Sequence, residues 1–173
     1  KFFAPYGLVR YGVAPDHQKT KNIIKLFNRV LEKDNVNFFG NINVPKDISL
    51  DFLSENYDAV LIATGASDDK LLNIEGENIE GVYGSAEFVG WYNDNPEYSN
   101  LEPNLNSMNV IIIGNGNVAL DCARILAKTN EELYGSDISK KNLKLLSKAK
   151  IDNIYVIGRR GPKEAKFTIS ELR

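Results

Sequence analysis

Two short motifs in the second half of the sequence could bind a phosphorylated nucleotide. The first, Gly114-x-Gly116-x-x-Ala119, has the GxGxx(G/A) spacing of a dinucleotide-binding turn. In such a turn the first glycine permits a tight bend, the second lets a pyrophosphate approach the backbone, and the small third residue lets the helix pack closely on the sheet. The second motif, Arg159-Arg160, presents two guanidinium groups, which can bind a phosphate dianion through forked, charge-assisted hydrogen bonds.

The elements predicted around these motifs are those that such a site requires. A strand over 109–113 precedes the glycines and a helix over 120–128 follows them, so the first amides and the positive end of the helix dipole would face the phosphates. A strand over 153–157 leads to the arginines, at the place where NADP-binding proteins carry arginine for the 2′-phosphate. The motifs are more than twice the usual roughly 20 residues apart, so the insertion 129–150 must fold outside this unit. The simpler alternatives are a glycine turn that only joins strand to helix and a solvated arginine turn.

The rest of the chain predicts an α/β fold with a parallel sheet and flanking helices. Further helices are predicted over 19–33, 50–55, 85–92 and within 129–150. A serine is the predicted N-cap of the last three: Ser49, Ser85 and Ser139. A strand pattern occupies 37–44, and the continuous apolar run 57–64 is typical of a strand buried on both faces of a parallel sheet. Glycines and prolines make residues 1–18 irregular.

Composition narrows the class of protein. The 173 residues carry 21 Lys and Arg against 23 Asp and Glu, a net charge of −2, which gives no electrostatic case for a nucleic-acid or anionic-membrane partner. The lysines within 140–150 are interpreted as a solvated helix face. The single His17 and single Cys122 exclude a disulfide framework or a Cys/His zinc site within this chain, and Cys122 is expected in the core. No apolar run reaches the roughly 18 residues that span a bilayer.

Longer stretches of the sequence resemble the adrenodoxin reductase family, the mitochondrial-type ferredoxin–NADP reductases. The resemblance rests on motifs in the same order from end to end: 7–17, 88–93, 101–103, 114–121, 123–126, 158–162, 167–169 and 171–173. It implies a fold related to glutathione reductase, in which an FAD-binding domain is split in sequence around an NADP-binding domain. Residues 1–65 would then be part of the FAD-binding domain, and residues 66–173 part of a Rossmann-like NADP-binding domain.

The resemblance also implies the residues that form the site. The implied NADP contacts are Asn115, Gly116, Asn117 and Val118 at the pyrophosphate, Arg159 and Arg160 at the 2′-phosphate, and Glu171. The implied FAD contacts are Leu8 and Val44, with His17 near the flavin and Arg173 facing an acidic ferredoxin. Asn115 stands where the family usually has glutamine, which shortens one side chain at the turn. Taken from the residues alone, His17 is an ordinary surface or core histidine.

The activity implied by the resemblance is electron transfer from NADPH through FAD to a 2Fe–2S ferredoxin, in a monomeric mitochondrial enzyme. Two alternatives remain: the flavin subunit of a glutamate-synthase-like oxidoreductase, and a non-catalytic module that binds NADPH. The abrupt first and last residues suggest a fragment of a larger protein whose targeting information is missing. We therefore expect this chain to be inactive by itself.

Overall fold

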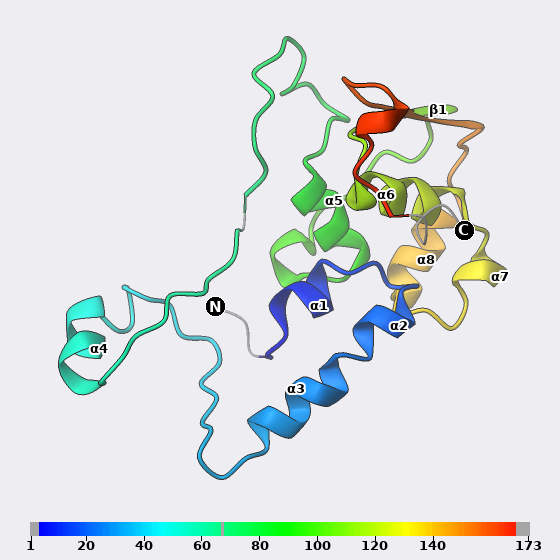
Figure 1. The fold of residues 1–173 in the computed structure, drawn as a ribbon. Helices are drawn as coiled ribbons and strands as arrows, with labels where there is room; N and C mark the ends of the chain where they lie inside the picture. The colour runs from blue at the N-terminus through cyan, green and yellow to red at the C-terminus, as the bar shows by residue number, and fades with distance from the viewer. Residues whose placement is uncertain (1–3, 67, 169–173) are drawn as a thin grey trace.

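The computed structural model describes residues 4–66 and 68–168 (Figure 1). Its helices and strands, in chain order, are α1 (Gly7–Tyr11), α2 (Gln18–Lys21), α3 (Ile24–Leu31), α4 (Leu50–Asn56), α5 (Ser85–Tyr92), η1 (Pro96–Tyr98), β1 (Asn109–Ile113), α6 (Asn117–Ala127), α7 (Asn130–Leu133), α8 (Lys140–Leu146), β2 (Asn153–Ile157) and η2 (Pro162–Glu164). Within these ranges no helix combines the length and the apolar character needed to cross a bilayer.

The two strands form a parallel pair, as the sequence predicts. Asn109 lies opposite Asn153 at one end and Ile113 lies opposite Ile157 at the other. The amide of Gly114 continues the ladder by donating to the carbonyl of Ile157 at 2.9 Å. Because helix α6 begins only a few residues after β1 and contacts both strands, the expected strand–turn–helix–strand unit is confirmed.

The core lies among the helices that accompany this sheet. Trp91 and Tyr92 of α5, Ile125 of α6 and Leu133 of α7 are almost completely buried. Cys122 belongs to the same cluster, as expected of a small apolar side chain. Figure 1 shows α5, α6 and α8 lying together in this part of the molecule. The core therefore supports the helix that follows the glycine turn.

The central part of the chain differs from its prediction. Residues 57–64, expected to be a buried strand, are exposed throughout, and Leu61 is 90% exposed. The strand predicted over 37–44 does not form either. Among the described residues neither segment has a partner strand, and an apolar run can form a buried sheet only when other strands and helices cover it. Figure 1 shows α4 standing apart from the helices of the core.

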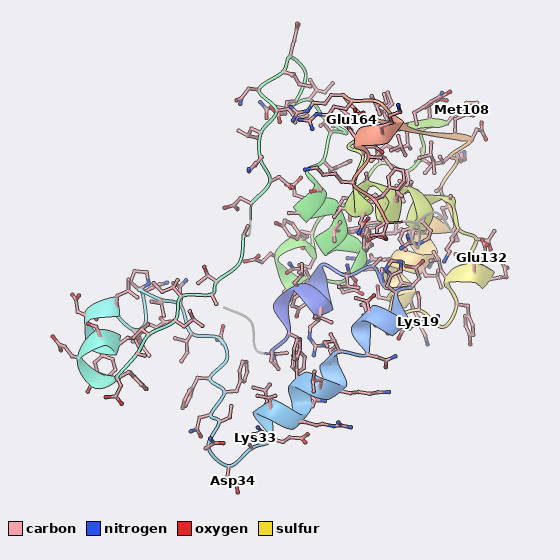
Figure 2. The ribbon with its side chains drawn as sticks, in the orientation of Figure 1. Lys19, Lys33, Asp34, Met108, Glu132 and Glu164 are labelled. Atoms are coloured by element: carbon pink, nitrogen blue, oxygen red, sulfur yellow. The ribbon has the colours of Figure 1, made fainter. Side chains whose placement is uncertain are left out.

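The predicted helix 19–33 is divided into α2 and α3. The amides of Lys25 and Leu26 donate to carbonyls three residues earlier, at Asn22 and Ile23, which tightens the chain there and separates the two helices. Figure 2 shows Lys19 and Lys33 toward opposite ends of the pair. The segment 1–18, predicted to be irregular, contains the short helix α1.

Two of the predicted serine caps are confirmed. The hydroxyl oxygens of Ser49 and Ser139 accept from the amides of Phe52 and Asn142, at the starts of α4 and α8. The third prediction is wrong by one residue, because Gly84 is the N-cap of α5. The region 129–150 forms two short helices, α7 and α8.

Candidate nucleotide-binding site

The glycine turn has the geometry that close approach of a phosphate requires. Gly114 has φ +156°, a conformation that side chains rarely adopt, and a Cβ on it would meet Ala119 at 3.4 Å. Gly116 precedes α6 with an extended backbone, and a Cβ built on it would meet nothing within 4 Å. The space beside Gly116 is thus open to a group that approaches the backbone.

The start of helix α6 is available to an anion. Its N-cap, Gly116, supplies no side-chain hydrogen bond, and its first turn contains no acidic residue. Asn117 and Val118 of this turn are exposed, while Ala119 is buried where the helix packs on the strands. Unsatisfied amides at the start of an 11-residue helix, together with the helix dipole, favour a phosphate at this point.

The paired strands place the arginines at the same edge of the sheet as the glycine turn. Because Ile113 and Ile157 are partners in the register, Gly114 and Gly158 follow at adjacent positions. Arg159 and Arg160 come next and are exposed. A Cβ on Gly158 would lie 3.0 Å from the Cβ of Asn115, so the half-buried Asn115 side chain packs directly over this glycine. The two motifs therefore lie side by side.

A segment near the end of the described residues also contacts the turn. The amide of Thr168 donates to Oδ1 of Asn117 at 2.9 Å, and the amide of Lys166 donates to the carbonyl of Asn115 at 3.0 Å. The side-chain oxygen of Asn117 in the turn therefore accepts a hydrogen bond from the protein's own backbone. The sequence contains no signal for this contact, because it joins residues 51 positions apart.

His17 lies in a loop that an ion-pair network joins to α6. Its Nε2 is 3.8 Å from Oδ1 of Asp121, and that oxygen accepts from Nη2 of Arg124 at 2.6 Å. Arg124 also donates to Asp16, the neighbour of His17, through Nε at 2.8 Å and Nη2 at 3.1 Å. Lys128 adds a bond from Nζ to Asp16 at 2.7 Å. The histidine loop is thereby connected to the helix that starts at the glycine turn.

The network keeps its central groups charged. Burial alone would raise the pKa of Asp16, but the hydrogen bonds and charges of Arg124 and Lys128 outweigh it and lower this pKa to about 2. Burial would lower the pKa of Arg124, and the bonds to Asp16 and Asp121 raise it above its ordinary value instead. Reasoning from the sequence did not identify Asp16, Arg124 or Lys128, since nothing local indicates a pair 108 residues apart.

The two residues expected at FAD are exposed on separate segments. Leu8 lies in α1 and is 78% exposed, and Val44 lies in the loop between α3 and α4 and is 45% exposed. Neither belongs to the glycine turn or the arginine pair. Glu171 and Arg173, the other predicted contacts, lie outside the described residues.

Comparison with known proteins places most of the chain in one family. Residues 13–159 match the family described as pyridine nucleotide-disulphide oxidoreductase. The chain is 48% identical to NADPH:adrenodoxin oxidoreductase, mitochondrial, of Arabidopsis thaliana, over 98% of this chain and 35% of that protein. It is 46% identical to NADPH-ferredoxin reductase FprA of Mycobacterium tuberculosis, over 98% of this chain and 37% of that protein.

A solved structure of a relative has the same fold. The structure of Mycobacterium tuberculosis FprA in complex with NADPH superposes with a TM-score of 0.96 at 45% identity, over 99% of this chain and 38% of that one. The predicted resemblance and the predicted α/β fold are thus confirmed. The chain spans little more than a third of the length of these relatives.

Proposed function

Because the chain belongs to the pyridine nucleotide-disulphide oxidoreductase family, we propose that it is part of an FAD-dependent reductase that transfers electrons from NADPH to a 2Fe–2S ferredoxin. When bound, FAD supplies the redox chemistry, because it accepts a hydride from NADPH and releases electrons one at a time. The named activities of the plant and bacterial relatives support this proposal. The chain's own part is to bind and orient the nucleotide.

The NADP half of the proposal is supported by one observation above all: the glycine turn and the arginine pair follow neighbouring parallel strands at the same edge. We assign the pyrophosphate to the backbone of Asn115, Gly116, Asn117 and Val118 at the start of α6. We assign the 2′-phosphate to Arg159 and Arg160. The open space beside Gly116 and the exposed guanidinium groups fit these roles.

The FAD half concerns the first part of the chain. The exposed side chains of Leu8 and Val44 fit van der Waals contact with a flat ring system, and they have no group that could form a hydrogen bond with a phosphate. His17 would then lie near the flavin, where it could hold or move a proton; its ring contacts Asp121 of the nucleotide helix. We propose a domain boundary at 65/66, with residues 1–65 in the FAD-binding domain and 66–173 in the NADP-binding domain.

The remaining assignments concern the partner and the compartment. We propose that Arg173 meets an acidic ferredoxin and that Glu171 contacts NADP. The Arabidopsis relative is named as mitochondrial, whereas FprA is a bacterial protein. A mitochondrial location and a monomeric state for this protein are therefore proposals, to be tested by cell fractionation and by sedimentation.

A single preparation tests the proposed function. A longer protein that contains this chain and matches the full length of the relatives should carry flavin absorbance and should reduce a 2Fe–2S ferredoxin with NADPH. Absence of bound flavin, with NADPH binding retained, would instead assign the chain to a non-catalytic nucleotide-binding module. Flavin without ferredoxin reduction would favour a glutamate-synthase-like oxidoreductase. The 173-residue chain alone should show no NADPH-dependent dye reduction, and clear turnover by it would contradict the division of the FAD-binding domain.

A further inference from the structure

A buried carboxylate joins the histidine loop to the nucleotide helix. The Asp16 side chain is only 7% exposed, and both of its oxygens accept hydrogen bonds from α6 or the residue that ends it. Arg124 binds it with two guanidinium nitrogens and Lys128 with its ammonium. A bidentate arginine–carboxylate pair fixes orientation as well as distance, because both groups are planar.

The loop that carries Asp16 and His17 is itself held in place. Ala14 and Pro15 are completely or almost completely buried. The Pro15 carbonyl accepts from the amide of Asp137 at 2.9 Å and from Nε2 of Gln18 at 3.0 Å. If α6 moved, these contacts would therefore prevent the loop from moving freely with it.

Arg124 lies between two acidic side chains with different surroundings. Asp16 belongs to the histidine loop, and Asp121 belongs to α6 and faces the His17 ring. Arg124 comes two turns after the start of α6, so roughly 10 Å of rigid helix separates it from the amides proposed for the pyrophosphate. Helix α6 also contacts β1 and β2, so the contact with Asp16 joins the histidine loop to this unit of strands and helix.

We propose that Asp16, acting through Arg124, is a positioning residue that fixes the nucleotide-binding helix relative to the histidine loop. This inference rests on the proposed function. A buried ion pair adds little stability compared with a well-packed apolar pair, but it specifies one geometry. Its function here is to place the nicotinamide end of NADPH relative to the flavin side of the molecule. The adenosine end, bound within the unit of β1, α6 and β2, does not depend on it.

The test compares three variants of the flavin-loaded, longer protein that contains this chain. Asp16→Asn removes the charge with little change of shape, and Arg124→Lys keeps the charge but loses the fork. Asp137→Asn is the matched control, because Lys21 and Asp137 form another ion pair next to the same loop, at 3.1 Å. The probes are NADPH and 2′,5′-ADP, which carries only the adenosine end. The readouts are kcat, KM and the long-wavelength absorbance that appears when nicotinamide and flavin rings stack.

Asp16→Asn should lower kcat by roughly ten- to a hundredfold, since a misplacement of about 1 Å has that effect on oriented reactants. The stacking absorbance should fall with it, while the affinity for 2′,5′-ADP should stay within about twofold because that end is distant. Arg124→Lys should show the same pattern more weakly, and Asp137→Asn should resemble wild type.

Two results would overturn the inference. One is a wild-type kcat and stacking absorbance in Asp16→Asn, or in Arg124→Lys if the first variant does not fold. The other is an equal loss of affinity for 2′,5′-ADP and NADPH, which would assign Asp16 a purely structural role in α6. If the wild-type protein bound no flavin or showed no response to NADPH, the proposed function would fail instead.

Discussion

Residues 57–64 and strand β1 are apolar runs of similar character in contrasting environments. In the first run every residue is exposed, and Ile62 is 67% exposed. In β1, each residue pairs with one of β2, and Ile112 packs against the core, although Ile111 and Ile113 on the other face are 61% and 64% exposed. The difference lies in the partners: β1 has a parallel neighbour and a covering helix within the described residues, and the 57–64 run has neither. An apolar run therefore determines only that a segment can be buried, and its partners determine whether it is.

The same contrast separates the two halves of the described structure. Helices α5 to α8 share a core, whereas α3 and α4 contain no buried residue. The relatives are nearly three times as long as the matched region, and we propose that their additional length covers the surfaces left open around α3, α4 and 57–64.

The largest expected effect is the difference in unfolding free energy between an Ile→Ala substitution in the core and the same substitution in 57–64. Ile125→Ala, at a side chain with no exposure, should lower the free energy of unfolding by about 2–5 kcal/mol, because it leaves a cavity in the core. Ile62→Ala should change it by less than about 0.5 kcal/mol. Urea unfolding of the 173-residue chain measures both. Equal losses would show that 57–64 is packed in solution, contrary to the structure.

The next effect concerns the ion-pair network that joins the two halves. The pKa of Asp16 is lowered from 3.8 to about 2, so its stabilising contribution is complete above about pH 4 and disappears as the pH falls toward 2. Asp16→Asn should cost on the order of 1–2 kcal/mol near pH 7 after allowance for solvent screening. The difference in unfolding free energy between wild type and variant should shrink between pH 4 and pH 2. A difference that stays constant over this range would show that the negative charge of Asp16 does not cause the stabilisation.

The glycine turn provides an effect that stability measurements should not detect. A methyl group on Gly116 meets nothing within 4 Å, so Gly116→Ala should leave the unfolding free energy within about 0.5 kcal/mol of wild type. In the flavin-loaded longer protein the same substitution should weaken NADPH binding by about tenfold or more, because the methyl group occupies the space through which the pyrophosphate approaches the backbone. Unchanged NADPH affinity would argue against the pyrophosphate assignment.

The smallest effect uses the two confirmed serine caps. Ser139→Ala should lower the global unfolding free energy by about 1 kcal/mol, because α8 carries Leu146 into the core. Ser49→Ala removes an equivalent hydrogen bond from α4, which buries nothing, so it should only increase local hydrogen exchange in that helix. If both variants lowered global stability equally, α4 would be part of the cooperative unit.

The strand–turn–helix–strand unit of β1, α6 and β2 could be predicted from sequence because its signals are local. The glycine spacing, the strand before it, the helix after it and the arginines after β2 lie within short segments, and the parallel pairing of β1 and β2 confirmed their relation. The exposure of residues 57–64 could not be predicted, because burial of an apolar run depends on partner strands and helices that the run itself does not specify. The contacts of Asp16 with Arg124 and of Asn117 with Thr168 were also missed, since each joins distant positions through a single side chain.

We propose that the turn after β1 and the arginines after β2 bind opposite ends of one phosphorylated adenosine. The pair of dissociation constants for NADPH and NADH, measured in the flavin-loaded longer protein with and without Arg160→Ala, tests this assignment. Loss of a charged hydrogen bond of about 1.5–3 kcal/mol should raise the dissociation constant of NADPH by roughly ten- to a hundredfold. The dissociation constant of NADH should stay within about twofold of wild type. Equal weakening of both nucleotides, or of neither, would contradict the claim.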